Sequence, residues 1–377
     1  MEQFRSKLSV IIPVFNCEKY ISRCLDSLIE SQPYEIIIVD DFSTDGSKRI
    51  CEKYADSFAN INLLCNSKNR GVTYTKYTGL CHARGKYVTF VDADDWVEGS
   101  FFKQAEQFME ENGKVDIVVG KMINDDAGGK QKCIIDFPDE RLLDRQNALE
   151  ELFLWNMYRW EMCGKIYRRT LFDSWMPDYS IKVCEDLDCT WQVFQNANNV
   201  LALPVDFYHY YVNENSATNT MNYIDNNSYR VFERILSEKR LLGESALRIA
   251  EKHYVLSLVN IIRTLILQES KDGEIIKYQK KAKIILEGDT SGLYDAYANI
   301  FQSPQMAKNA LKKVEAEICE LANELLLKEN SSKSADGSSN KIYLYGIGVV
   351  AKTVGFLLGK NGYYSFEYVV SDDQFKY

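Results

Sequence analysis

Two groups of aspartates, Asp40-Asp41 and Asp92-Ala93-Asp94-Asp95, each follow a run of apolar residues. Alternate residues of an extended strand share a face, so we expect Asp92 and Asp94 to point to the same side. Paired carboxylates suit a hard divalent cation, Mg²⁺ or Mn²⁺, whose other ligands would be diphosphate oxygens and water. Such an ion would neutralise the charge of a leaving diphosphate. The alternative interpretation is an acidic turn that caps a helix starting near Trp96.

The elements that must position these aspartates alternate in type along the N-terminal third. Four buried strands are expected at Leu8–Val14, Glu35–Val39, Ile61–Cys65 and Tyr87–Val91, with amphipathic helices in the three intervals. This alternation predicts an α/β domain built on parallel strands. Ligands of such sheets bind beyond the carboxyl ends of the strands. Residues 13–16, 40–41 and 92–95 should therefore meet in one crevice.

Five segments in this order form a recognisable series of motifs. They are Val10-Ile11-Ile12-Pro13-Val14-Phe15-Asn16, then Ile37 to Ser47, then Asn69-Arg70-Gly71, then Ala83-Arg84-Gly85-Lys86-Tyr87, and Val91-Asp92-Ala93-Asp94-Asp95. The series closely resembles the family-2 nucleotide-sugar glycosyltransferases of GT-A fold, of the type that makes bacterial surface polysaccharides. The resemblance is strong over residues 7–120 and weaker to about residue 215.

The resemblance implies a role for each matching position. Pro13 and Phe15 would line the nucleoside pocket, and Asp41 would hydrogen-bond the base or the ribose. Asp92 would contact the ribose or a metal-bound water, and Asp94 would be the direct ligand of Mn²⁺ or Mg²⁺.

A later acidic pair, Glu185-Asp186, resembles the Glu-Asp motif of the same family, in which the aspartate is the general base. A carboxylate near the acceptor can take the proton of the attacking hydroxyl. The alternative interpretation is a helix N-cap cluster, because apolar residues at helical spacing follow. Asp188 is the neighbouring candidate for the base.

Some positions depart from the family pattern. Lys76 stands where arginine is common, and it could face a phosphate as a point charge or lie on a solvated helix surface. Phe42 replaces a usual glycine, which leaves the turn after Asp41 open. Tyr211 stands where arginine is frequent, and His209 is expected either to approach the diphosphate or to pack in the core. The aromatic residues Trp155, Tyr158 and Trp160 are read as a sugar-stacking platform or, at helical spacing, as core.

The rest of the 377 residues divides by composition. We predict a GT-A domain at 1–222, with a nucleotide-binding half at 1–120 and an acceptor half at 121–222. A helical region at 223–330, a Ser-rich linker at 331–340 and a Rossmann-like βαβ fragment at 341–377 would follow. The glycine motif at 346–351 lacks a second half that could hold a dinucleotide, so no NAD is predicted.

The net charge and the cysteines limit the binding partners and the cellular location that the sequence predicts. Lys and Arg number 45 and Asp and Glu 54, a net charge of −9, which disfavours broad binding to nucleic acid. Ten scattered cysteines and an N-terminus without signal-peptide character predict a cytosolic protein. The apolar stretch 254–267 is too short to span a bilayer. The lysines at 277, 280, 281 and 283 could contact anionic lipid headgroups or form a solvated helix face.

These expectations combine into an inverting, metal-dependent transfer of a sugar from a nucleotide-diphosphate sugar, most simply a UDP-sugar. The acceptor would be a hydroxyl of a glycan or lipid-linked glycan at the cytoplasmic face of the membrane, with peripheral membrane contact. One alternative is a catalytically silent sugar-nucleotide-binding or scaffold protein. Another is a regulatory or assembly protein in which the C-terminal fragment carries the main role.

Overall fold

The computed structural model of the chain describes residues 7–31, 33–111, 113–125, 131–211, 228–267, 271–286, 303–309, 342–345 and 366–369. The chain divides into two compact units, residues 1–257 and 258–377. The predicted domain boundary at 222 falls between described segments and stays a prediction.

The first half of the first unit alternates strands and helices, as the sequence predicts. Its elements are β1 (Leu8–Val14), α1 (Ile21–Ser31), β2 (Glu35–Asp40), α2 (Ser47–Ser57), β3 (Ile61–Cys65), α3 (Val72–His82), β4 (Tyr87–Phe90), β5 (Trp96–Val97) and α4 (Gly99–Glu111). Strands β1, β2, β3 and β4 pair in parallel. The helix after the aspartates begins at Gly99, beyond the short strand β5, so the prediction of a helix starting near Trp96 was wrong.

The second half of this unit mixes strands and helices less regularly. Its elements are β6 (Ile117–Asp125), β7 (Gln131–Ile135), β8 (Arg141–Asp144), α5 (Arg145–Leu154), β9 (Lys165–Arg168), the 3₁₀ turn η1 (Arg169–Phe172), α6 (Glu185–Phe194), β10 (Asn199–Tyr211), α8 (Ser228–Ser237) and η3 (Lys239–Leu241). The sheet has ten strands in the order β3-β2-β1-β4-β9-β6-β10-β5, with β7 on β6 and β8 on β10. Strand β9 is antiparallel to both β4 and β6, and it joins the two halves into one sheet.

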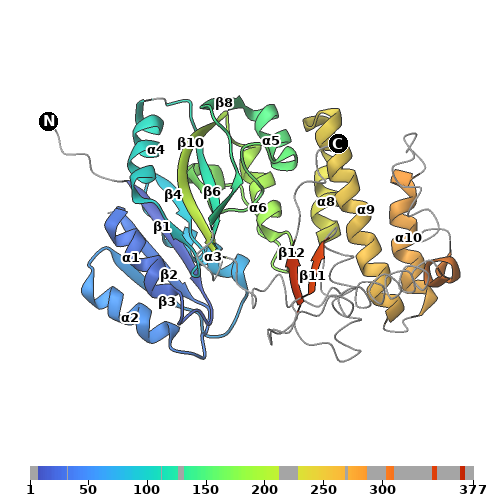
Figure 1. Cartoon of the computed structure of the whole chain (residues 1–377), viewed down its shortest axis with the longest axis horizontal. Helices are drawn as coiled ribbons and strands as arrows, with labels where there is room; N and C mark the ends of the chain where they lie inside the picture. The colour runs from blue at the N-terminus through green and yellow to red at the C-terminus, as the bar shows by residue number, and fades with distance from the viewer. Residues whose placement is uncertain are drawn as a thin grey trace, which may run out of the picture. The chain divides into compact units, whose positions relative to one another are not determined.

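The core lies on both faces of the parallel strands, which explains why β2 is buried along its whole length. Apolar residues of α1 and α4 pack with Val10 and Ile12 on one face. Helix α3 covers the other face, where a Cβ on Gly79 would lie 2.4 Å from the side chain of Ile11. Figure 1 shows α1, α2 and α4 on one side of this sheet and α3 on the other. The predicted α/β layering is confirmed.

Helix α9 (Glu244–Leu267) begins in the first unit, and the second unit contains α10 (Asp272–Leu286) and the strands β11 (Ile342–Tyr345) and β12 (Phe366–Val369). The helical region predicted after the α/β domain is confirmed for these helices. Strands β11 and β12 pair in parallel, while the predicted linker and the glycine motif lie outside the described residues. Among the residues placed by the structure, no helix is both long and apolar enough to cross a membrane. The nine cysteines in the described ranges all carry free thiols.

Candidate active site

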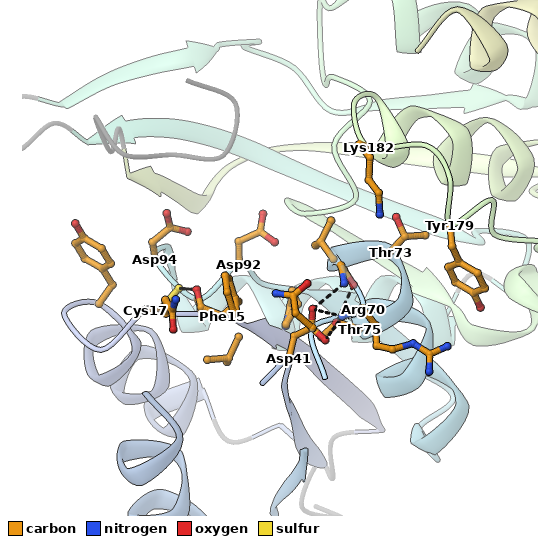
Figure 2. A pocket seen from close by; sticks show the side chains of 18 of the residues that line it. Phe15, Cys17, Asp41, Arg70, Thr73, Thr75, Asp92, Asp94, Tyr179 and Lys182 are labelled. Carbon is orange, nitrogen blue, oxygen red and sulfur yellow. Dashed lines mark hydrogen bonds between the residues drawn. The ribbon is translucent and has the colours of Figure 1, made fainter. Parts of the chain in front are cut away.

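A cavity of about 410 Å³ opens at the carboxyl ends of β1, β2 and β4. The crevice expected from the strand order is therefore present. Figure 2 shows the side chains around it, with Phe15, Asp41, Asp92 and Asp94 along the strand ends. Its lining comprises Pro13, Val14, Phe15, Asn16, Cys17, Tyr20, Asp41, Asn69, Arg70, Gly71, Val72, Thr73, Thr75, Asp92, Ala93, Asp94, Tyr179, Ile181 and Lys182.

Asp41 is buried at the end of β2 and holds the loop that precedes α3. Its carboxylate accepts hydrogen bonds from Asn66 Nδ2 at 2.7 Å, from the Arg70 amide at 2.9 Å and from the Gly71 amide at 2.8 Å. Gly71 has φ +87°, in the left-handed region that favours glycine. Asp41 thus fixes the Asn69-Arg70-Gly71 loop against the cavity, and its contact with a base or ribose stays a prediction.

Asp95, the next residue, fixes the loop that contains Asp92 and Asp94. Asp95 is buried, and it accepts hydrogen bonds from the Tyr208 hydroxyl at 2.6 Å and from the Tyr211 amide at 2.8 Å. The Tyr208 oxygen in turn accepts from the Asp92 amide at 3.0 Å. Burial and the neighbouring Asp92 and Asp94 raise the pKa of Asp95 well above its usual value.

Asp92 and Asp94 are both partly exposed and line the cavity. In the described part of the chain, no three His, Cys, Asp or Glu side chains come together as a metal cage. Two carboxylates fit Mg²⁺ or Mn²⁺ when substrate phosphates and water complete the coordination, which is common for Mg²⁺. The donor set therefore fits a divalent ion that binds together with a diphosphate.

Lys76 joins the two predicted functional carboxylates. Its Nζ lies 3.0 Å from Asp186 Oδ1 and 3.5 Å from Asp92 Oδ1, and only 3% of its side chain is exposed. Burial opposes the charged form, but Asp186, Asp92 and Glu185 outweigh it and raise the pKa of Lys76 well above its usual value. The solvated-lysine alternative is wrong, because the Lys76 side chain is buried and its ammonium group pairs with Asp186 and Asp92.

Asp186 lies in the first turn of α6, and Lys76 links it to Asp92, which lines the cavity. The N-cap residue is Cys184, at φ +62°, and it makes no side-chain capping bond. Asp186 bonds to the Lys76 ammonium group, a contact that the N-cap interpretation does not account for. Beside it, burial and the charge of Asp186 raise the pKa of Glu185 to about 7.

Asp188, the neighbouring candidate for the base, faces a different partner. It is buried, and its carboxylate pairs with Arg234 and accepts from Gln192 Nε2 at 3.2 Å. Of the two aspartates, Asp186 is therefore the one that shares a cation with Asp92.

Tyr179, Ile181 and Lys182 form a part of the cavity lining that the sequence did not predict. Figure 2 shows Lys182 extending from the wall opposite the strand ends toward the cavity. Arg70 and Lys182 are the two cations in the lining, against three aspartates. Lys182 is not part of a motif, although Glu185-Asp186 follows three residues later, and only the folded structure places it in the cavity lining.

The other positions singled out by sequence resolve mostly to structural roles. Phe42 has φ +66°, so a phenylalanine adopts the left-handed backbone conformation at the turn position where glycine is usual. His209 is buried, with Nδ1 2.8 Å from Asp125 Oδ2 and Nε2 3.0 Å from Glu98 Oε1. Of its two predicted placements, the one in the core is therefore correct. Tyr211 stacks its ring near the Arg23 guanidinium, at 4.7 Å.

The aromatic residues after α5 lie away from the cavity lining. The rings of Trp155 and Trp160 pack edge to face with their centroids 4.7 Å apart, and the centroid of the Trp160 ring lies 5.3 Å from that of His253 on α9. Tyr158 is buried and donates to the Ala148 carbonyl at 2.8 Å. Tyr158 therefore belongs to the core, while Trp155 and Trp160 pack against the helices at half-buried positions.

The fold and the cavity define an α/β domain with an acidic ligand site at the carboxyl ends of parallel strands. Residues 9–174 match the family model described as Glycosyl transferase family 2. The match covers strands β1 to β4 and the aspartates at their carboxyl ends.

Two curated relatives have similar sequences. An uncharacterized glycosyltransferase of Bacillus subtilis, EpsJ, is 31% identical over 222 residues, which cover 56% of this chain and 62% of that protein. The poly(ribitol-phosphate) beta-N-acetylglucosaminyltransferase TarS of Staphylococcus aureus is 30% identical over 212 residues, or 54% of this chain and 35% of that protein. The matched segment thus spans less than two thirds of either relative.

Solved structures of S. aureus TarS have a similar fold. The crystal structure of its residues 1–349 in complex with UDP-GlcNAc gives a TM-score of 0.52 at 24% identity, covering 68% of this chain and 71% of that chain. Another TarS crystal structure gives a TM-score of 0.50 at 25% identity, covering 68% of this chain and 43% of that chain. These similarities confirm the predicted GT-A type of α/β fold.

Proposed function

We propose that this protein is an inverting, metal-dependent glycosyltransferase that uses a nucleotide-diphosphate sugar. One observation carries the proposal: Lys76 holds Asp186, the candidate base, against Asp92 at the donor cavity. A transferase needs a carboxylate for the acceptor beside the donor site, and Asp186 would be that carboxylate, because Lys76 links it to Asp92 in the cavity lining. A site for nucleotide binding alone would not require Asp186.

The donor is a UDP-sugar in this proposal. Pro13 and Phe15 would contact the base, Asp41 would face the base or ribose, and Arg70 and Lys182 would lie near the phosphates. The relative TarS, named an N-acetylglucosaminyltransferase, has been crystallised with UDP-GlcNAc, which supports a UDP-sugar here. Lys76, paired with two carboxylates, would act on the phosphates only indirectly.

Asp94, with Asp92, would hold Mn²⁺ or Mg²⁺. When bound, the ion would neutralise charge on the departing diphosphate.

Transfer would proceed as a single displacement. The acceptor hydroxyl oxygen would attack the anomeric carbon while its proton passes to the Asp186 carboxylate. The bond to the diphosphate oxygen would break on the opposite side, which inverts the anomeric centre. A positioned carboxylate base contributes about 10²- to 10⁴-fold to such a step.

The acceptor we propose is a glycan or lipid-linked glycan in surface-polysaccharide synthesis, at the cytoplasmic face of the membrane. The relative TarS is named a poly(ribitol-phosphate) beta-N-acetylglucosaminyltransferase, which supports a polymer as the acceptor class. Lys277 and Lys280 are exposed on α10 and would supply the peripheral contact with anionic lipid.

Calorimetric titration with UDP-, GDP-, CMP- and dTDP-sugars, with and without Mn²⁺, tests the donor and the metal together. We expect Mn²⁺-dependent binding of one UDP-sugar, and at least a tenfold weaker affinity in Asp94→Ala with an unchanged melting temperature. The matched control is Asp56→Ala, at an exposed position on α2, which should bind like the wild type.

Equal binding with and without Mn²⁺ would overturn the metal role. Binding of a donor without transfer to any acceptor would favour the silent scaffold instead. Failure of the folded protein to bind any donor would contradict the whole proposal.

A further inference from the structure

Helix α8 contacts the segment that forms the wall of the cavity opposite the strand ends. Arg230 and Arg234 lie four residues apart on α8 and therefore on one face of the helix. Arg230 Nη2 lies 3.0 Å from Asp178 Oδ2, and Arg234 Nη1 pairs with Asp188 Oδ1. Two arginines of one helix thus attach both ends of segment 178–188.

The segment between these attachments carries functional groups on a backbone with little regular structure. Residues 178–184 precede the first turn of α6 without forming a helix or strand. Within the segment, Tyr179, Ile181 and Lys182 line the cavity, and Asp186 binds Lys76. With few backbone hydrogen bonds of its own, such a segment depends on side-chain contacts for its position.

Helix α8 itself is firmly packed in the first unit. Val231, Phe232 and Ile235 are buried, and the Phe232 ring stacks on the ring of His253 at 5.7 Å. The adjacent Tyr254 donates from its hydroxyl to Glu233 at 3.0 Å. The arginines therefore extend from a fixed support toward a segment that has less support of its own.

The burial of Asp188 strengthens the attachment at its C-terminal end. Burial raises the pKa of this carboxyl, and the charge of Arg234 opposes that effect. A buried carboxylate needs a partner, so Arg234 also determines where the first turns of α6 can lie. Asp186 is two residues earlier in the same helix.

We propose that Arg230 and Arg234 are positioning residues that hold segment 178–188 over the donor site and place Lys182 and Asp186 for the reaction. The proposal rests on the glycosyltransferase function proposed above. It makes α8, which lies beyond the family match at residues 9–174, a necessary part of the site.

The test is Arg230→Gln in the full chain, because Arg230 is 44% exposed and its loss should leave the fold intact. We expect hydrogen–deuterium exchange in segment 178–188 to rise about three- to tenfold, and the donor KM to rise by a similar factor, while kcat falls less. Arg230→Lys should restore part of both. The matched control is Arg248→Gln, which removes an exposed ion pair with Glu244 on α9 and should change neither.

Asp178→Asn probes the same contact from the other side. It should reproduce most of the exchange and KM changes. Adding Arg230→Gln should cost less than the sum of the two single changes, because both remove the Arg230–Asp178 pair, although Arg230 also donates to Ser180 Oγ. Unchanged exchange and KM in both variants would overturn the proposal. Exchange that rises in a protein without any transferase activity would support the positioning role and contradict the proposed function.

Discussion

The two sides of the cavity reach their positions by different routes. On the side of β1, β2 and β4, each site residue stands where its own strand ends, and Asp41 and Asp92 need only the parallel pairing to meet. On the opposite side, Asp186 and Lys182 lie in a segment fixed by Lys76, Arg230 and Arg234 from elements far away in sequence.

This difference predicts which parts of the site tolerate local change. Substitutions at strand ends should act on ligand contacts and leave the frame intact. Substitutions among the long-range ion pairs should couple catalysis to stability. The following variants test the contrast, from the largest expected effect to the smallest.

Asp186→Asn should have the largest effect on turnover. The amide keeps the shape but cannot take the acceptor proton, so we expect transfer to fall about 10²- to 10⁴-fold while donor binding persists. Single-turnover kinetics and calorimetry on the same sample separate the two. Asp188→Asn is the control, and it should lower stability more than the chemical step. A wild-type rate in Asp186→Asn would mean that the base lies elsewhere.

Lys76→Met should damage both transfer and stability. The change leaves Asp186, Asp92 and Glu185 without this cation, so we expect about a 10- to 100-fold slower reaction and a loss of about 2–4 kcal/mol in the free energy of unfolding. Denaturant unfolding and initial rates measure the two effects. Lys76→Arg, the residue common in the family, should retain most of both. Loss of stability with normal turnover would reduce Lys76 to a structural ion pair.

Glu185→Gln should change the pH dependence of stability. The pKa of Glu185 is raised from 4.5 to about 7, so between these values the folded state binds a proton that the unfolded chain releases. Stability therefore falls as pH rises through this window. The variant lacks this loss of stability. Its free energy of unfolding should exceed that of the wild type only slightly at pH 5 and by about 1–3 kcal/mol at pH 8.

Thermal unfolding at several pH values follows this effect. The control is Glu111→Gln, at an exposed position of α4, whose difference from the wild type should stay constant. An advantage independent of pH would show that Glu185 is ionised throughout.

Phe42→Gly should give the smallest effect, and a favourable one. Phe42 has φ +66° with 52% of its surface exposed, so glycine relieves a left-handed backbone and loses little packing. We expect a gain of about 1 kcal/mol in the free energy of unfolding, with unchanged donor binding. Phe42→Ala removes the ring and keeps the strain, so it should not stabilise. Equal stability of all three would show that this turn carries no strain.

The sequence alone determined the strand-end half of the site. Buried apolar runs that stop at Pro13, at Asp40-Asp41 and at Asp92 specify parallel strands, and parallel strands bring their carboxyl ends to one edge. The α/β class and the crevice therefore followed from local pattern. Phe42 shows the limit of this reasoning, because its turn persists although the expected glycine is absent.

Only the tertiary structure decided the other half. Whether Lys76 is solvated depends on where the first turn of α6 places Asp186, and the choice between Asp186 and Asp188 depends on which cation each one meets. Lys182 lies in an irregular stretch before the Glu185-Asp186 pair, in a segment that ion pairs connect to α8. Such contacts join residues 46 to 110 positions apart, and no local periodicity records them. Strand ends are specified by neighbouring residues, whereas charge pairing is specified by the folded arrangement as a whole.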